Sequence, residues 1–173
     1  MTRKCALIAS ALATLLIGAA LLVLDSRMMD AGGPGIVGFE LAGGEERATE
    51  ILDHWGDEGI DAAKASLWID YAYILAYGTF LVLAASATAD LSRRRGWRRM
   101  AGFGPVAISF AVAGAAFDAI EDVGLLLAVN GSGGAFAPRL AQACASLKFA
   151  LLATTIAYLL AGLLMRLRAR LRA

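Results

Sequence analysis

Four long apolar runs, separated by polar or glycine-rich segments, constrain what this chain can fold into. We predict that they are membrane spans at about residues 5–24, 67–89, 103–129 and 140–165. Each run can cross the hydrocarbon core of a bilayer as a helix, which takes about 20 residues. The 59% share of hydrophobic residues exceeds the roughly 45–50% of soluble domains. The sequence therefore predicts an all-α fold, a polytopic membrane four-helix bundle that forms a single domain over residues 1–173.

The first apolar run follows the basic start MTRK and could in principle belong to a cleaved signal peptide. It is longer than the roughly 7–15 residues of a signal-peptide core, and no A-x-A site lies beside its end at Leu24. We therefore expect this run to remain in the protein as a membrane span.

Basic residues fix the expected orientation of the spans. One side of any four-span arrangement carries Arg3, Lys4, Arg93, Arg94, Arg95, Arg98, Arg99, Arg166, Arg168, Arg170 and Arg172. The opposite side carries only Arg27, Arg47, Lys64 and Arg139. The positive-inside rule then predicts a multi-pass protein of the cell membrane with cytoplasmic N- and C-termini. We expect the arginines to contact membrane lipids, and no nucleic acid is expected as a partner because basic clusters alone are a weak signal.

The segment between the first two spans, about 25–64, is predicted to lie outside the cytoplasm and is acidic, with ten carboxylates against three bases. Within it, apolar residues recur at i, i+3, i+4 and i+7, which predicts a short amphipathic helix at about 45–55 that Gly56 or Gly59 can end. The apolar stripe consists of Ala48, Ile51, Leu52 and Trp55. We expect this helix to lie at the outer interface or to fold over the mouth of the bundle, with His54 solvated.

Ionisable residues inside the predicted spans are the strongest functional lead. Each charge at the bilayer centre costs roughly 2.5–3.5 kcal/mol, so several of them in a small protein indicate a function. The candidate catalytic residues are Asp118, Glu121, Asp122 and Lys148. The candidate ligand-binding residues are Asp70, Tyr73, Tyr77, Asp25 and Cys144.

The helical rise places these residues in one layer. At about 1.5 Å per residue, those of the last three spans lie roughly 5–16 Å below the outer helix ends. We expect Lys148 to pair with Asp118 or Asp122, and at least one remaining acid to be protonated or to bind a cation. The tyrosines could donate hydrogen bonds to the acids. Cys5 and Cys144 are expected on opposite sides of the bilayer, too far apart for a disulfide.

The layout resembles the emopamil-binding/sigma-2-receptor (EXPERA-like) superfamily of four-helix membrane proteins. The likeness rests on four helices, a long first outer loop with a short helix, and acids facing the interior; Asp25 and either Asp57 or Asp61 resemble acids of that group. The resemblance implies an internal lipophilic cavity. The acids of 103–129 and Lys148 are not part of this resemblance.

Four functions stay open at this level. The first is a pocket that binds a small lipophilic or cationic ligand. The others are an intramembrane acid–base enzyme, isomerase- or cyclase-like, on a lipid or isoprenoid; proton or ion transport as a homo-oligomer; and a structural or assembly subunit. The D-x-x-E-D spacing at 118–122 could also hold a hard metal ion through oxygen ligands. No nucleotide, haem or hydrolase motif is present, so the sequence identifies no cofactor.

Overall fold

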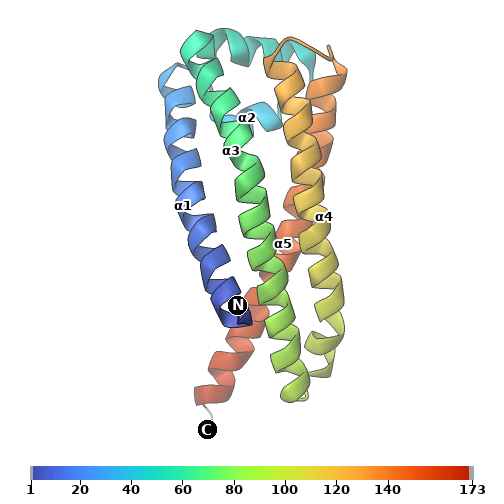
Figure 1. The fold of residues 1–173 in the computed structure, drawn as a ribbon. Coiled ribbons are helices and arrows are strands. Elements are labelled where there is room, and N and C mark those ends of the chain that lie inside the picture. The colour runs from blue at the N-terminus through green and yellow to red at the C-terminus, as the bar shows by residue number, and fades with distance from the viewer. Residues whose placement is uncertain (1, 172–173) are drawn as a thin grey trace.

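The computed structural model describes residues 2–171, which are almost entirely helical and include no strand (Figure 1). The elements are α1 (Arg3–Asp30), α2 (Ile36–Glu40), α3 (Glu45–Arg94), α4 (Arg98–Val129) and α5 (Phe136–Leu171). The predicted all-α class is therefore confirmed. The four long helices are each long and apolar enough to cross a membrane.

Each predicted span falls inside one long helix, but the helices extend further than the apolar runs. The segment 25–64, expected to be mainly a loop, is largely helical: only residues 31–35 and 41–44 lie outside helices. The expected helix at 45–55 is the first part of α3, which kinks at Gly56, where φ is +56°. Such a backbone conformation favours glycine. Gly59, the other residue expected to end this helix, lies instead within the helix that continues.

The long helices pack in the order α1, α3, α4, α5. Helices α3, α4 and α5 all contact one another, whereas α1 packs along α3 and makes no comparable contact with α4 or α5. Only Ser10 and Met28 are buried in α1. The bundle is therefore unpaired along one side, between α1 and α5.

The two ends of the bundle differ in construction (Figure 1). The start of α1 and the end of α5 lie at one end, here called the terminal end, and the first part of α3 crosses the other, here called the capped end. There Ile51 and Trp55 are buried, as the apolar stripe predicted, and the Trp55 ring lies 5.0 Å from that of Phe39. The indole of Trp55 donates a 2.8 Å hydrogen bond to the carbonyl of Pro34. His54 is exposed, as expected.

Small residues bring α3, α4 and α5 close together toward the terminal end. A Cβ added at Gly104 would lie 2.4 Å from the Cβ of Ala89, and one added at Gly162 would lie 2.4 Å from Thr88 Cγ2. Such residues let helix backbones approach closely. The phenol of Tyr158 donates a 3.2 Å hydrogen bond to a carbonyl of α4.

An ion-pair network lies at the terminal end, at the basic segments of the sequence. Arg3 of α1 pairs with Asp90 of α3, which also accepts a 2.5 Å hydrogen bond from Arg93. Arg172, one of the basic residues used to predict orientation, lies outside the described residues. Cys5 and Cys144 are both free, as expected.

Candidate functional site

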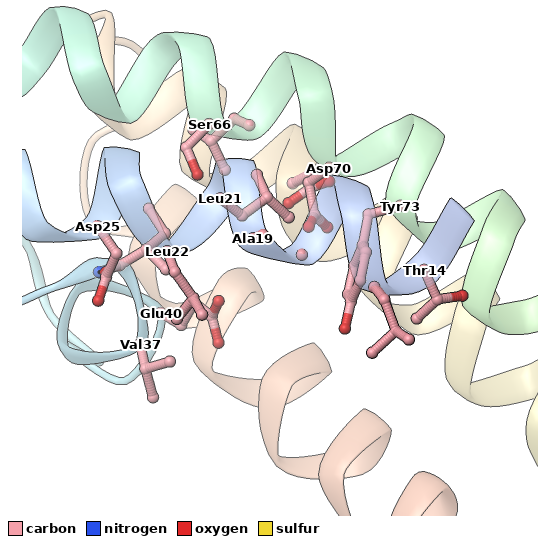
Figure 2. Close-up of a pocket in the computed structure, with 15 residues that line it drawn as sticks. Thr14, Ala19, Leu21, Leu22, Asp25, Val37, Glu40, Ser66, Asp70 and Tyr73 are labelled. Atoms are coloured by element: carbon pink, nitrogen blue, oxygen red, sulfur yellow. Dashed lines mark hydrogen bonds between the residues drawn. The ribbon is translucent and has the colours of Figure 1, made fainter. Parts of the chain in front are cut away.

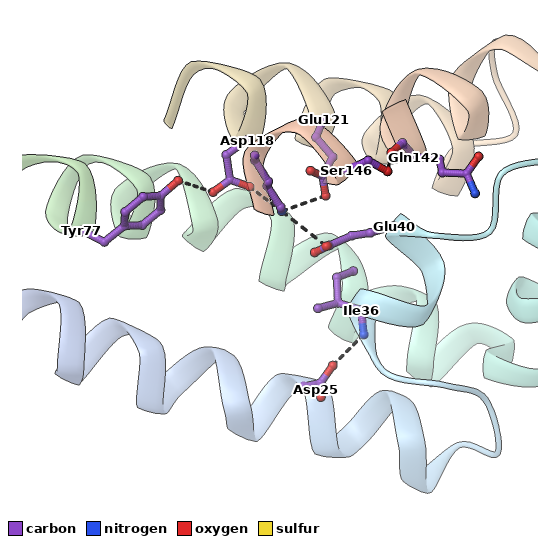
Figure 3. A network of polar contacts seen from close by, with 9 residues as sticks. Asp25, Ile36, Glu40, Tyr77, Asp118, Glu121, Gln142 and Ser146 are labelled. Carbon is purple, nitrogen blue, oxygen red and sulfur yellow. Dashed lines mark hydrogen bonds and ion pairs between the residues drawn. The ribbon is translucent and has the colours of Figure 1, made fainter. Parts of the chain in front are cut away.

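Lys148 of α5 is the centre of a buried ionic cluster near the capped end. Its Nζ lies 2.6 Å from Asp118 Oδ1, 2.9 Å from Glu121 Oε1 and 3.3 Å from Glu40 Oε2. Figure 3 labels the three acids of this cluster, Glu40, Asp118 and Glu121. Only 8% of the lysine side chain is exposed. The predicted pairing with Asp118 is confirmed, while Asp122, the alternative partner, forms no ion pair with the lysine.

Asp118 also has a tyrosine as a hydrogen-bond partner. The phenol of Tyr77, on α3, donates a 2.6 Å hydrogen bond to Asp118 Oδ2. The other carboxylate oxygen accepts from Lys148, so both oxygens have partners. This contact joins α3, α4 and α5 through buried polar groups, which are costly unless they are paired in this way.

Glu40 is the functional candidate that sequence reasoning missed. It ends the five-residue helix α2 and is 7% exposed. Burial raises the pKa of Glu40 above 4.5, and the attraction of Lys148 offsets only part of that rise. A helix of five residues is too short to show a period, and Glu40 is one of ten carboxylates in its segment. The one available signal was its place between two apolar residues, Phe39 and Leu41.

Helix α2 is held at both of its ends. Asp25 of α1 accepts a 2.6 Å hydrogen bond from the backbone N–H of Ile36, the first residue of α2. A Cβ at Gly35 would lie 2.3 Å from an oxygen of Asp25, so the close approach requires glycine. Glu40 at the other end reaches the lysine of α5. Helix α2 therefore bridges α1 and α5 across the unpaired side of the bundle (Figure 3).

Asp70 of α3 and Asp122 of α4 form a second, separate acidic pair. Both side chains line the same cavity, which is described below. Among residues 2–171, neither carboxyl group forms an ion pair with a lysine, arginine or histidine. Asp122 is 3% exposed, and its Oδ2 has no hydrogen-bond partner among residues 2–171. The pair therefore has no ion-pair partner of its own in this part of the chain.

Two adjoining cavities, of about 460 and about 530 Å³, lie beside these acids. They share five lining residues from α1, α2 and α3: Thr14, Val37, Glu40, Asp70 and Tyr73. Figure 2 shows Asp70, Tyr73 and Glu40 facing the first cavity, which Asp122 also lines. Asp118 and Lys148 line the second, together with an apolar face of α5. The combined volume is in the range of small-molecule sites, about 300–1,000 Å³.

The remaining predicted site residues have other positions. Glu121 is fully buried against Lys148, and its Oε2 has no hydrogen-bond partner in the part of the chain that the structure describes. Cys144 is buried but lines neither cavity. Asp57 and Asp61, the loop acids that carried part of the family resemblance, are exposed and do not line the cavities.

The hydrogen-bonded cluster ends at Tyr77. Toward the terminal end, the next buried side chains of α3 and α4 are apolar: Leu81, Ala85, Ala107 and Ala111. This apolar packing favours a pocket over a polar conducting path through the bundle. In the described part of the chain, no group of three or more histidine, cysteine, aspartate or glutamate side chains is arranged to hold a metal ion, so the D-x-x-E-D hypothesis gains no support.

Fold and site together define a helical protein with four potential membrane spans and an acidic internal cavity. No protein-family model, curated protein or solved structure matches the chain. The resemblance to the emopamil-binding/sigma-2-receptor superfamily therefore stays a prediction.

Proposed function

We propose that this is a multi-pass cell-membrane protein that binds a small lipophilic ligand with a cationic group in the cavity between α1, α3 and α5. The observation that carries the proposal is the acidic pair Asp70–Asp122 on a largely apolar wall, neither member of which has an ion-pair partner among residues 2–171. A ligand amine would supply the missing positive charge, and the apolar wall would receive the rest of the ligand.

The charge balance of the cluster supports a cation as the ligand. Five acids from α2, α3 and α4 gather near a single lysine. That lysine already contacts three of them, which leaves Asp70 and Asp122 for a ligand. The ring of Tyr73, which is half-buried in the cavity wall, could add a cation–π contact worth about 0.5–2 kcal/mol.

Binding is tested with a radiolabelled alkyl-trimethylammonium probe and protein in lipid nanodiscs. Asp70→Asn is expected to weaken binding about 10- to 100-fold, because a hydrogen bond or ion pair to a charged group is worth about 1.5–3 kcal/mol. Asp30→Asn, at an exposed position at the end of α1, is the matched control. Equal affinity of the two variants would contradict the proposal.

We further propose that the terminal end is cytoplasmic and that the cavity lies in the outer half of the bilayer, as the positive-inside pattern implies. Single cysteines at His54 and Arg170, in a background without native cysteines, test this in intact cells. A membrane-impermeant maleimide should label the cysteine at 54 and not the one at 170. Labelling of the cysteine at 170 and not of the one at 54 would contradict the proposed orientation.

An intramembrane acid–base enzyme is the second candidate, favoured by one observation. Asp122 presents a buried oxygen without a hydrogen-bond partner next to a second carboxyl group, an arrangement that can hold a proton for transfer. Native mass spectrometry of protein released from its own membranes would identify any copurifying lipid and the number of copies in a homo-oligomer. A chemically altered lipid that accumulates with the parent chain and is absent with Asp122→Asn would favour the enzyme.

A further inference from the structure

One face of α5 forms an unusually long apolar wall of the second cavity. Its members recur at helical spacing on one side of the helix: Phe149, Leu152, Ile156, Leu159 and Leu160. From Lys148 to Leu160 the helix rises about 18 Å, at about 1.5 Å per residue. Half of a hydrocarbon core is about 15 Å thick. The wall is therefore as long as one lipid tail in one leaflet.

The opposite wall of the same cavity is apolar over much of that length. It is formed by Tyr73, Tyr77, Phe80 and Leu81 of α3. Between the walls of α3 and α5 the polar groups lie at one end only, where Asp70, Asp118 and Lys148 line the cavity. The cavity thus has a charged end and an apolar arm, the same division that an amphiphile has.

The cavity is reachable from the side of the bundle. Ile156 and Leu160 are 46% and 54% exposed although they line it, because α1 does not pack against α5. At the capped end, by contrast, α2 is tied to Asp25 and Lys148 and covers the charged end. An apolar ligand can therefore enter between α1 and α5 and need not pass α2.

We infer that the ligand is a lipid with a cationic headgroup, bound with its head at Asp70 and Asp122 and one tail along α5 as far as Leu160. The inference rests on the proposed function and names the class of its ligand. A protonated or quaternary amine matches the acidic pair, whereas an anionic head there would meet the carboxyl groups of Asp70, Asp122 and Glu40. The length of the α5 wall requires a tail rather than a compact amine.

The test uses three probes and the full chain in nanodiscs. Two are trimethylammonium compounds, with a butyl and a dodecyl tail, each with a photoreactive diazirine at the tail end. The third is a dodecyl sulfonate with the same diazirine. The dodecyl ammonium probe should crosslink near Leu159 and Leu160, the butyl probe near Phe149, and the sulfonate should not label the cavity. Crosslinked peptides are mapped by mass spectrometry on the unaltered protein, so this arm does not depend on any variant folding.

Ile156→Trp fills the apolar arm and should weaken binding of the dodecyl ammonium probe about tenfold while leaving the butyl probe unchanged. Ile120→Trp, at an exposed position on α4 that lines neither cavity, is the matched control. If neither ammonium probe binds, the proposed function fails. If both bind but the long tail labels no α5 residue, the inference fails while a cation pocket stands. If the sulfonate labels the cavity equally, the cavity does not select a cation, and both the inference and the proposed function fail.

Discussion

The capped and terminal halves of this bundle are built from the same helices in opposite ways. Near the capped end, long polar and aromatic side chains surround open cavities, and α2 fills part of the space between α1 and α5. Toward the terminal end, glycine and alanine bring α3, α4 and α5 into close contact. Side-chain size therefore sets the helix separation: the close contacts of the terminal half hold the helices together, so the capped half can keep its cavities.

The largest effect is expected from breaking the ionic cluster of the capped half with Lys148→Met. Removing one partner of a buried ion pair leaves uncompensated charge and costs about 3–5 kcal/mol. Three acids contact this lysine, so we expect loss of the folded protein or a much lower midpoint in denaturant unfolding in micelles. Lys64→Met is the control, because Lys64 is partly exposed and forms no ion pair among residues 2–171. Unchanged unfolding of both variants would show that the cluster contributes little to holding this half together.

The tight half is tested with Gly104→Ala. The new methyl group would lie 2.4 Å from the Cβ of Ala89, so α3 and α4 must separate, at about 1–3 kcal/mol for an overpacked core. Gly102→Ala on the same helix meets nothing within 4 Å and should be neutral or stabilise by up to about 1 kcal/mol through helix propensity. Thermal unfolding of the two variants in parallel measures the difference. Equal melting temperatures would mean that close approach is not what holds this half.

A smaller effect is expected from releasing α2 with Asp25→Ala. The substitution removes the oxygen that accepts from the N–H of Ile36, and loss of such a cap costs about 0.5–2 kcal/mol. Hydrogen exchange should increase in 36–40 and stay unchanged at the terminal end. Asp30→Ala, five residues further along α1 and exposed, should leave exchange in α2 as it is. Equal hydrogen exchange in the two variants would show that Asp25 does not hold α2 in place.

The smallest effect concerns pH and Glu40. Its folded pKa is raised by burial above 4.5, so the folded protein holds this proton more tightly than the unfolded chain does. The stabilising contribution of Glu40 is therefore complete below pH 4.5 and is lost as pH rises through the raised pKa. The melting temperature of Glu40→Gln should fall less steeply with rising pH over that range than the melting temperature of the parent protein. Arg47→Gln, at an exposed position on α3, should keep the parent slope. A parent and a Glu40→Gln protein with the same slope would exclude this residue as the cause.

The sequence predicts the regular parts of the molecule well, because long apolar runs and helical rise are local properties. They indicated the four long helices, the layer of acids and the Lys148–Asp118 pair. These local properties did not predict that Asp122 would pair with Asp70, because this pairing depends on how α3 and α4 are rotated relative to each other. Glu40 was missed because its burial depends on α4 and α5, which lie far away in the chain. The unpaired side of α1 was missed for a similar reason: Ser10, Thr14 and Gly18 recur at helical spacing on α1, a pattern of small and polar residues that also occurs on packed helices.

The arrangement of charges on α4 and α5 has a consequence for biosynthesis. Helix α4 carries three acids, and the lysine that contacts two of them lies on α5. Before α5 is made, each of these acids would cost roughly 2.5–3.5 kcal/mol at the bilayer centre. Residues 130–135 form a short connection, so the two helices can enter the bilayer together as a hairpin. In the membrane arrangement proposed above, α4 thus depends on α5, which is translated after it, for its place in the bilayer, and a chain that stops before α5 should fail to retain it there.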